Sequence, residues 1–415
     1  MNARYIRRPI LFSLALLLLF CQGCGHHTSA MPTDNAYHLE TDYQDSYKGN
    51  NSFYFTDTPE GTAYNGSGRL YMIPDDASAL QVCCSKPECQ HSSFAVTCTA
   101  AMPWMERGPQ YMNGKLYYIE TSGNTTNLCR MDVTGENREV LREESTEFLA
   151  GNSGLVFHRG FLYVYCMENR SEQSTTLKLY QLDLKTPSSE MKLLWEEEIP
   201  GMSISLVSNF TARGNYLFFQ DPNFDLYTDK ETTPILLHSM DLQTGKIYDC
   251  ILPNGELPTE FAIVDDRVFV SVLTNEGYRL ISFSYTFEEP ADFPERAQQE
   301  KIYLCGDPKY LYIWQKKVPT LYILDKNAQQ LDAVDISFFQ PKSSSAMVRS
   351  SMLEDGRVYI TKGGANFGFY YFDKSEIGSG QIQLKGLPIV CSVDEYFDPI
   401  PMPDDFDWDW YSIHE

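Results

Sequence analysis

The stretch MNGKLYYIETSGNTTNLCRMDVTGENREVL, residues 112–141, contains a pattern that recurs through most of the chain. It opens with a turn at Gly114 and continues with an apolar and aromatic run that predicts a strand over residues 116–120. A polar turn separates this run from a second predicted strand around residues 128–132. The tight turn TGEN and a third strand ending at Leu141 follow. This order of turns and short strands indicates a small antiparallel sheet.

The same pattern returns in six further segments. These are residues 51–76, 158–186, 212–252, 265–285, 307–336 and 354–374. Their first strands recur roughly every 40 to 60 residues, which is the period of β-propeller blades with about four short strands each. One small twisted sheet cannot bury both of its faces, but sheets packed radially around an axis can. The sequence therefore predicts an all-β fold, a β-propeller over residues 51–388, with seven blades expected and six or eight as alternatives. A two-sheet sandwich would not be expected to repeat the D-x-x-T-G turn.

Composition limits the possible partners. The 415 residues are 43% hydrophobic and 13% aromatic, which is enough for a packed core of strands. The formal net charge of −23 excludes a nucleic-acid partner, because phosphates require clustered Lys and Arg. The same charge disfavours broad contact with an anionic membrane surface. The simplest role of this acidity is to keep an exposed protein soluble.

The first residues have the layout of a secretory signal. Three arginines lie among the first eight residues, and residues 10–20 are apolar except for Ser13. This run is too short for a typical membrane span, but it fits the hydrophobic core of a signal peptide. It ends in CQGCG, with the small residue Gly23 directly before Cys24. We therefore expect residues 1–23 to be a signal peptide.

The sequence around Cys24 resembles the lipobox of bacterial lipoproteins, whose cysteine is lipidated and becomes the mature N-terminus. It departs from that pattern at Cys21, where Leu is usual, and at Gln22, where a small residue is usual. The resemblance implies an extracytoplasmic protein, anchored to the cell membrane as a lipoprotein through Cys24. Ordinary signal-peptidase cleavage would instead release a secreted protein. The polar residues 24–50 predict a flexible tether in front of the propeller.

A compact group of cysteines and one histidine stands in VCCSKPECQH, residues 82–91, with a further cysteine shortly after it. Cys84, Cys89, His91 and Cys98 form a Cys₃His set, which is a standard ligand set for structural zinc. Against this, C-x4-C-x-H is not the usual zinc-knuckle spacing. A disulfide such as Cys84–Cys98 is the competing interpretation, because the predicted compartment lies outside the reducing cytosol. In either case we expect a structural role, pinning the link between the first two blades.

The repeat and the cysteine group resemble those of a known group of proteins. The unit GKLYYI…LCRMDVTGEN is similar to the repeats of poorly characterised Gram-positive extracytoplasmic lipoproteins with TolB-like, DUF5050-like β-propellers. CSKPECQH together with Cys98 is similar to a C-x-K-P-x-C-x-H…C signature near the N-terminus of many of them. The resemblance covers residues 51–387. It implies a fold and a location, and it brings no established activity.

The sequence contains no complete signature of a common hydrolase, metalloprotease, P-loop or dinucleotide-binding site. We therefore expect a non-enzymatic binding or scaffold protein for a protein, peptide or glycan ligand. The longest polar insertion between predicted strands is DPNFDLYTDKETT, residues 221–233, and loops on a rigid scaffold commonly carry function. Its candidate binding residues are Asp221, Asp225, Tyr227 and Asp229. The alternative is a polysaccharide hydrolase or lyase using carboxylates in the propeller funnel. Residues 389–415 are an acidic, aromatic tail.

Overall fold

The computed structural model describes residues 32–44, 54–66, 69–75, 81–84, 86–89, 98–102, 105–122, 125–145, 153–168, 174–200, 210–221, 236–253, 256–315, 318–337, 346–362, 369–387, 389–390 and 399–400. The chain divides into two compact units, Met1–Pro32 and Thr33–Glu415, and the strands that the structure describes all lie in the second. Within the described ranges no α-helix occurs. Nor does any described helix have the length and apolarity needed to span a membrane.

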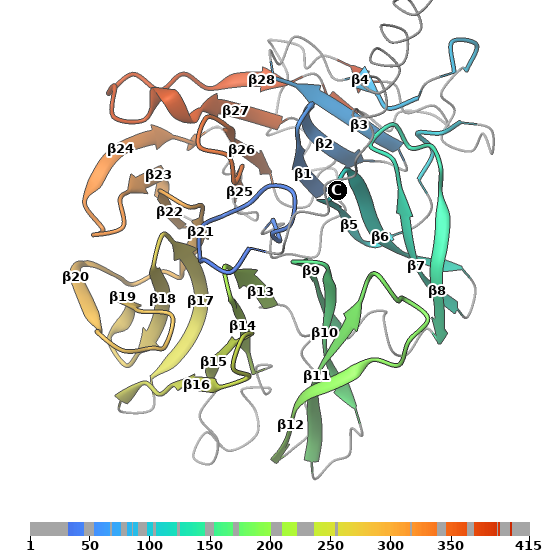
Figure 1. Ribbon diagram of the computed structural model, residues 1–415. Coiled ribbons are helices and arrows are strands. Elements are labelled where there is room, and N and C mark those ends of the chain that lie inside the picture. The colour runs from blue at the N-terminus through green and yellow to red at the C-terminus, as the bar shows by residue number, and fades with distance from the viewer. Residues whose placement is uncertain are drawn as a thin grey trace, which may run out of the picture. The chain divides into compact units, whose positions relative to one another are not determined.

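The described residues of Thr33–Glu415 form seven four-stranded antiparallel sheets, each built from four strands that are consecutive in the chain. The sheets are arranged around an axis as the blades of a propeller, with the first strand of each blade toward the centre (Figure 1). The prediction of an all-β propeller with seven blades is therefore confirmed. Blade 1 consists of β1 (Tyr54–Thr58), β2 (Gly61–Gly66), β3 (Arg69–Pro74) and β4 (Gln81–Val82), and blade 2 of β5 (Met105–Met112), β6 (Lys115–Ser122), β7 (Thr125–Met131) and β8 (Glu139–Ser145). Blade 3 consists of β9 (Ser153–His158), β10 (Phe161–Glu168), β11 (Ser174–Asp183) and β12 (Lys192–Pro200), and blade 4 of β13 (Phe210–Arg213), β14 (Tyr216–Gln220), β15 (Leu237–Asp241) and β16 (Ile247–Cys250).

The last three blades follow the same plan. Blade 5 consists of β17 (Leu257–Val264), β18 (Arg267–Thr274), β19 (Gly277–Phe283) and β20 (Ala291–Gln298). Blade 6 consists of β21 (Ile302–Gly306), β22 (Leu311–Gln315), β23 (Val318–Leu324) and β24 (Gln330–Asp335), and blade 7 of β25 (Ala346–Ser350), β26 (Arg357–Lys362), β27 (Phe369–Asp373) and β28 (Lys385–Leu387). A 3₁₀ turn, η4 (Lys374–Glu376), follows β27, and β29 (Ile389–Val390) pairs with β30 (Pro399–Ile400).

Local sequence explains why the first two strands of a blade form hairpins. In blade 2 the turn residues Asn113 and Gly114 have φ values of 50° and 75°, and in blade 3 Arg159 and Gly160 have φ values of 49° and 80°. Two consecutive residues with positive φ form the turn whose twist matches antiparallel strands, and glycine adopts this conformation without strain. The M-N-G-K and H-R-G-F segments of the sequence are therefore the hairpin turns.

The core lies between the blades. Tyr165 of blade 3 and Phe219 of blade 4, for example, have ring centroids 5.1 Å apart in one shared apolar cluster. Blade 7 meets blade 1 in the same way: Phe55 stacks on Tyr359 at 4.7 Å, and the Tyr359 hydroxyl donates to Thr62 Oγ1 at 3.0 Å. Since each blade is built from consecutive strands, side-chain packing rather than a shared strand closes the ring.

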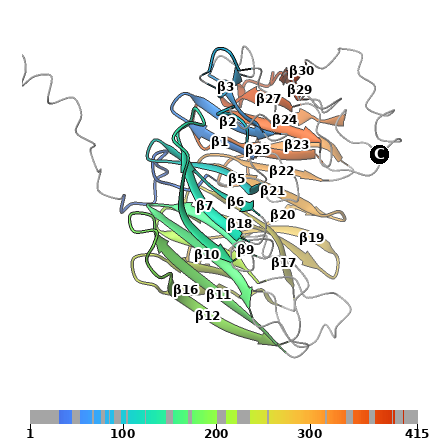
Figure 2. The same cartoon turned by 90° about the vertical axis from the view of Figure 1, so that its right-hand side faces the viewer.

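Residues 33–44, the axial segment, precede the first blade and pack against the propeller. This segment lies across the centre of the ring in Figure 1 and on one face of it in Figure 2. It hydrogen-bonds to the turns that join the first two strands of several blades, so it covers the end of the axis where those turns lie. Part of the predicted tether is thus packed against the propeller.

A candidate binding site at the axial end of the propeller

Three blades hold the axial segment through the backbone of their turns. Asn113 N–H donates to the Glu40 carbonyl at 2.7 Å, and Arg159 N–H donates to the Thr41 carbonyl at 2.6 Å. Asn215 N–H donates to Asn35 Oδ1 at 2.9 Å. These contacts join elements far apart in the sequence, so they fix the segment on the axis only after the blades have assembled.

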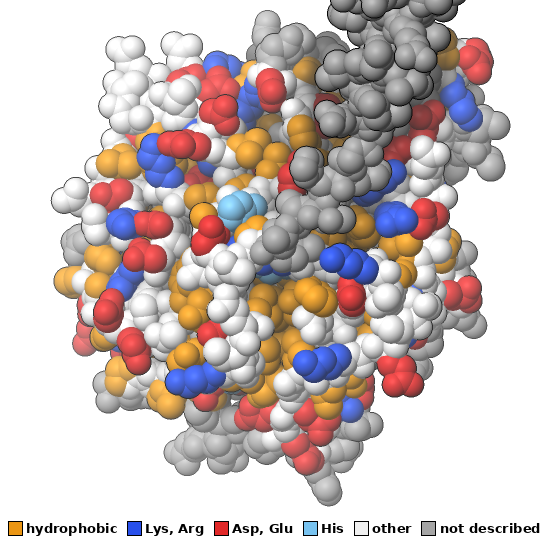
Figure 3. All heavy atoms as spheres, in the orientation of Figure 1, with side chains coloured by type: hydrophobic (Ala, Val, Ile, Leu, Met, Phe, Trp, Pro, Cys, Tyr) orange, Lys and Arg blue, Asp and Glu red, His pale blue; other side chains and the backbone are white. Residues whose placement is uncertain are grey.

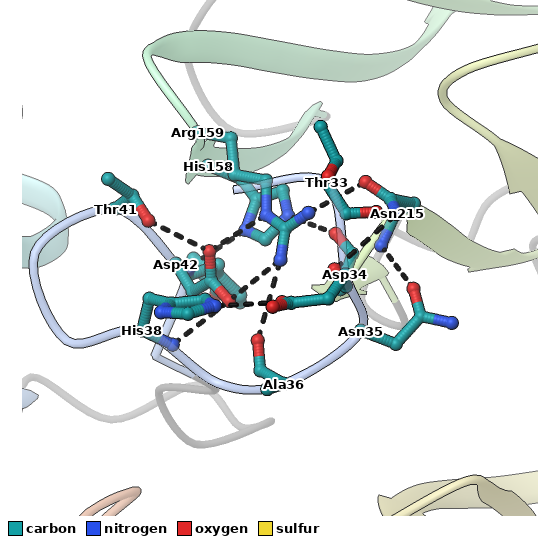
Figure 4. Close-up of polar contacts among 12 residues, drawn as sticks. Thr33, Asp34, Asn35, Ala36, His38, Thr41, Asp42, His158, Arg159 and Asn215 are labelled. Atoms are coloured by element: carbon teal, nitrogen blue, oxygen red, sulfur yellow. Dashed lines mark hydrogen bonds and ion pairs between the residues drawn. The ribbon is translucent and has the colours of Figure 1, made fainter. Parts of the chain in front are cut away.

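A buried ion pair fastens the middle of the axial segment. Arg159 Nε donates to Asp42 Oδ1 at 2.9 Å, and both side chains are buried (Figure 4). A second nitrogen of the same guanidinium donates to Asn215 Oδ1 at 2.6 Å. One arginine therefore connects the axial segment with blades 3 and 4 by charge-assisted hydrogen bonds, which are stronger than neutral ones.

His158 beside this pair is neutral. Tyr43 N–H donates to His158 Nδ1 at 2.9 Å, so Nδ1 has no proton, and Nε2–H donates to the Gly214 carbonyl at 2.7 Å. Burial of the ring lowers the pKa of His158 to about 4, against the opposing effect of Asp42. Gly214 itself has φ +56°, and a Cβ there would lie 2.5 Å from Asn35 Cα, so this close approach requires glycine.

Asp57 connects the axial segment with the seam between blades 7 and 1. Its carboxylate Oδ2 accepts hydrogen bonds from Ser351 Oγ and from Met352 N–H, both at 2.9 Å. Its backbone carbonyl accepts from Gln44 Nε2 at 2.7 Å. All of these groups are buried or nearly so, which makes Asp57 a structural carboxylate of the ring closure.

A cavity of about 530 Å³ opens beside the axial segment, within the 300–1,000 Å³ range of small-molecule sites. The axial segment forms one wall, and the turns of blades 5, 6 and 7 form the rest. Its lining residues are Tyr37, Leu39, Asp265, Asp307, Pro308, Lys309, Tyr310, Met352, Leu353, Glu354 and Lys374. The cavity thus combines aromatic and aliphatic walls with charges of both signs. On this face apolar side chains gather around the centre of the ring and charged ones around its rim (Figure 3).

The floor of the cavity is a buried ion pair. Lys374 Nζ lies 2.8 Å from Asp307 Oδ2, and the two side chains are 2% and 0% exposed. Asp307 also accepts from Tyr312 and Ser350 hydroxyls at 2.8 and 2.6 Å. Burial opposes ionisation of Asp307, but the ammonium group of Lys374 outweighs it and lowers the pKa of the carboxyl. A carboxylate that stays ionised cannot act as the general acid of a glycosidase, so Asp307 does not fit that role.

Three of the four predicted metal ligands lie together. The sulfurs of Cys84, Cys89 and Cys98 are all within 4.8 Å of one another, and the structure has all three as thiols. Burial opposes ionisation of Cys84, but hydrogen bonds from Thr99 and from the backbone of Lys86 lower the pKa of this thiol to about 6. Burial raises the pKa of Cys98 to about 11. This sulfur cluster could hold a metal ion. The fourth predicted ligand, His91, and the predicted lipidation site, Cys24, lie outside the described residues.

The residues around the sulfur cluster bind to blade 1. Cys83 N–H donates to the Leu70 carbonyl at 3.0 Å, and Leu70 N–H donates to the Ala100 carbonyl at 2.8 Å. On the blade 2 side, Arg138 Nη2 donates to the Thr99 carbonyl at 2.6 Å. The cluster therefore lies between the first two blades, where the sequence predicts a pinned link.

Asp221, one of the predicted binding residues, is engaged inside blade 4. Its Oδ2 accepts from Leu236 N–H at 3.1 Å, and its Oδ1 lies 3.1 Å from His238 Nε2. These contacts close the base of the predicted recognition loop. Asp225, Tyr227 and Asp229 lie outside the described residues.

The cavity wall is a feature that the sequence did not predict. Tyr37 and Leu39 fall in the predicted tether, although two alternate apolar residues inside a polar stretch are a weak signal of a packed, extended segment. The turn residues Asp307, Lys309 and Tyr310 belong to a predicted blade, but nothing in the local pattern shows that they converge with the axial segment.

The fold and site place the protein among β-propellers. No family model matches the chain, and no curated protein is similar to it in sequence. Among solved structures, a prolyl endopeptidase is 12% identical with a TM-score of 0.52, over 95% of this chain and 56% of that one. The tricorn protease is 12% identical with a TM-score of 0.49, over 85% of this chain and 36% of that one, so this chain spans about a third of its length. TolB from Acinetobacter baumannii is 10% identical with a TM-score of 0.35, over 67% and 61%. This likeness is one of fold.

Proposed function

We propose that the protein is a lipid-anchored extracytoplasmic propeller at the outer face of the cell membrane, and that it binds a peptide or glycan in the cavity beside the axial segment. The observation that carries the proposal is the cavity itself. Its volume suits a chain end or a few sugar units, and Tyr37 and Tyr310 offer aromatic surface to them. Its buried charges are already paired, which suits recognition better than catalysis.

Binding to arrays of peptides and oligosaccharides tests this function. We expect wild-type protein to bind a defined subset, and Tyr310→Ala to lose at least about 10-fold in affinity for it, because an aromatic wall of the site is removed. Tyr248→Ala is the matched control, since Tyr248 lies on β16 at the outer edge of blade 4. Equal affinities of both variants for every captured ligand would refute binding in the cavity.

The sulfur cluster supports a second part of the proposal, a structural zinc site with His91 as the fourth ligand. Zn–S bonds of about 2.3 Å in a tetrahedron place the sulfurs about 3.8 Å apart. The observed limit of 4.8 Å for Cys84, Cys89 and Cys98 fits such a site. Hydrogen bonds that lower the pKa of Cys84 to about 6 favour the thiolate that a metal ligand must provide, whereas Cys98, whose pKa is raised to about 11, would lose its proton on metal binding.

Elemental analysis of the purified protein, with thiol titration under denaturing conditions, tests the zinc site. We expect about one zinc per chain, and loss of it in Cys89→Ser. Cys250→Ser is the control, because this cysteine is buried in the interface of blades 4 and 5. A deficit of two thiols without zinc would replace the metal site by a disulfide.

Detergent phase partitioning of cells tests the anchor. We expect the wild-type protein in the membrane fraction and Cys24→Ser in the aqueous one, because a lipid on that cysteine is the proposed attachment. Membrane retention of Cys24→Ser would contradict lipidation at this residue.

A further inference from the structure

Arg349 is a buried cation whose guanidinium has no hydrogen-bond partner among the described residues. It lies on β25, the inner strand of blade 7, and its residue is 4% exposed. Within the described part of the chain, neither Nε nor either Nη of its guanidinium has a hydrogen-bond partner. Its Cζ lies 5.4 Å from the centre of the Phe55 ring, so a ring covers one face and the donor edge is left for another group. In folded proteins a buried guanidinium group usually has a hydrogen-bonding acceptor or a counter-ion, because removing the charge from water costs free energy.

Two more donors that find no acceptor among the described residues lie close by. Arg213 ends β13 and is also 4% exposed; its Nε is one of these donors, and its Nη2 lies 3.7 Å from Met352 Sδ, which is a weak acceptor. The buried hydroxyl of Tyr37 is the other, and it interacts electrostatically with both arginines. The axial segment, blade 4 and blade 7 thus each contribute a donor that is unsatisfied among the described residues, and the two arginines interact with the same tyrosine.

The charges around the axis do not balance. Arg159 is neutralised by Asp42, and Lys374 by Asp307. At this end of the axis, Asp57 is the one further buried carboxylate among the described residues. It supplies one negative charge, whereas the two arginines next to Tyr37 supply two positive charges. His158 is neutral. Counted over the buried groups that the structure describes at this end, positive charges therefore exceed negative ones by one.

We propose that the axis contains a binding site for an oxyanion, the carboxylate or phosphate group of a small acid, held by Arg349, Arg213 and Tyr37. Guanidinium groups are suited to both oxyanions because their donors form a planar fork. Two cavity residues lie next to these donors: Met352 Sδ is 3.7 Å from Arg213 Nη2, and Tyr37 interacts electrostatically with both arginines. Entry of the anion from the cavity therefore requires these two side chains to move. The inference rests on the proposed function: it makes the cavity ligand an acid whose anionic end reaches the axis.

Thermal unfolding of the purified full chain with sodium acetate, sodium phosphate or sodium chloride at equal ionic strength tests the site. We expect acetate or phosphate to raise Tm by about 3 °C or more over chloride at saturation. A response to acetate alone assigns a carboxylate, and a response to phosphate alone assigns a phosphate group. No difference of either from chloride would overturn the site.

Variants show whether such a response arises at the axis. Arg349→Met and Arg213→Met are expected to abolish it, and Tyr37→Phe, which keeps the ring, is expected to weaken it. Arg279→Met should retain it in full, because Arg279 pairs with Glu256 and Asp292 away from the axis. If Arg349→Met does not fold, Arg213→Met and Tyr37→Phe carry the test. A response that persists in both folded axial variants would overturn the site.

The anion site and the proposed function fail separately. Tyr310→Ala removes the cavity wall but none of the three donors, so it should lose the peptide or glycan and keep the Tm response. Array binding by wild type without any oxyanion response would overturn the anion site and leave the proposed function standing.

Discussion

Lys374 shows how much one buried charge can contribute at this site. Its ammonium group donates to the Ser351 and Leu353 carbonyls at 2.6 and 2.9 Å, besides its ion pair with Asp307. Lys374→Met would leave Asp307 buried and uncompensated. We expect the free energy of unfolding to fall by about 3–5 kcal/mol, measured by chemical denaturation.

The control for this prediction is an exposed ion pair. Lys326 contacts Asp265 at 2.6 Å with side chains 47% and 50% exposed, so Lys326→Met should cost less than about 1 kcal/mol. Equal costs for Lys374→Met and Lys326→Met would contradict the idea that burial makes the first pair essential.

His238 predicts a dependence of stability on pH. Its Nδ1 lies 2.8 Å from Asp249 and its Nε2 3.1 Å from Asp221, and only the imidazolium can donate from both nitrogens. Burial alone lowers the pKa of His238, but the two carboxylates outweigh it and raise the pKa above 6.5. Glu197 adds further negative charge nearby.

The sign of this effect follows from the raised pKa. The stabilisation is complete below the unfolded-state value near 6.5 and is lost as the pH rises through the folded-state value. We expect the Tm of wild type to fall more than that of His238→Gln between about pH 6 and pH 9. Parallel Tm curves for the two proteins would rule out the charged histidine.

At the scale of elements, the axial segment behaves as a separate unit docked on the blade turns. Arg159→Met removes its ion pair with Asp42 and leaves that carboxylate buried. We expect amide hydrogen exchange in residues 33–44 to accelerate about 100-fold, since local opening needs less free energy. Strands of blades 5 and 6 should exchange as in wild type.

Arg267→Met is the matched control for the axial segment. Arg267 donates to the Ser282 and Glu289 carbonyls within blade 5, so its loss should leave residues 33–44 protected. Acceleration of these amides in both variants would mean that the segment opens with the whole propeller rather than on its own.

The elements differ in how far the sequence predicts them. Hairpins such as β6–β7 follow from local signals: an apolar and aromatic run over residues 116–120, a polar turn, and a second run around residues 128–132 predict this antiparallel pair. The axial segment has no such periodicity. Its position depends on Asn113, Arg159 and Asn215, which become neighbours only when three blades are assembled. The cavity could not be predicted for the same reason, because its lining comes from five separate stretches of the chain.

The cysteine cluster was predictable in part, less fully than the hairpins and more fully than the cavity. The group Cys84, Cys89 and Cys98 is predicted from residue type and short separation, and the three sulfurs do converge. The sequence leaves the choice between metal and disulfide open, because it depends on distances and on chemistry that spacing does not contain. Asp221 shows the opposite situation: a residue chosen for its loop is buried at the loop's base, in contact with His238.

At the scale of the whole molecule, the seam between blades 7 and 1 differs from the other six. Consecutive blades are joined by the chain, whereas the described residues of blade 7 and blade 1 share no strand and are held together through side-chain contacts. Phe55, Tyr359 and the Asp57 carboxylate form this contact, together with Arg357, which donates to the Pro74 carbonyl at 3.1 Å. Opening of the ring should therefore begin here.

Tyr359→Ala tests where the ring opens. Loss of this buried ring should lower the free energy of unfolding by about 3–5 kcal/mol and accelerate hydrogen exchange first in β1 and β26. Tyr165→Ala creates a comparable cavity between blades 3 and 4, which the chain connects, so the exchange of β1 and β26 should then rise only with global unfolding. If hydrogen exchange in β1 and β26 rises equally in both variants, the seam between blades 7 and 1 is as stable as the interface between blades 3 and 4, and the idea that the ring opens there is wrong.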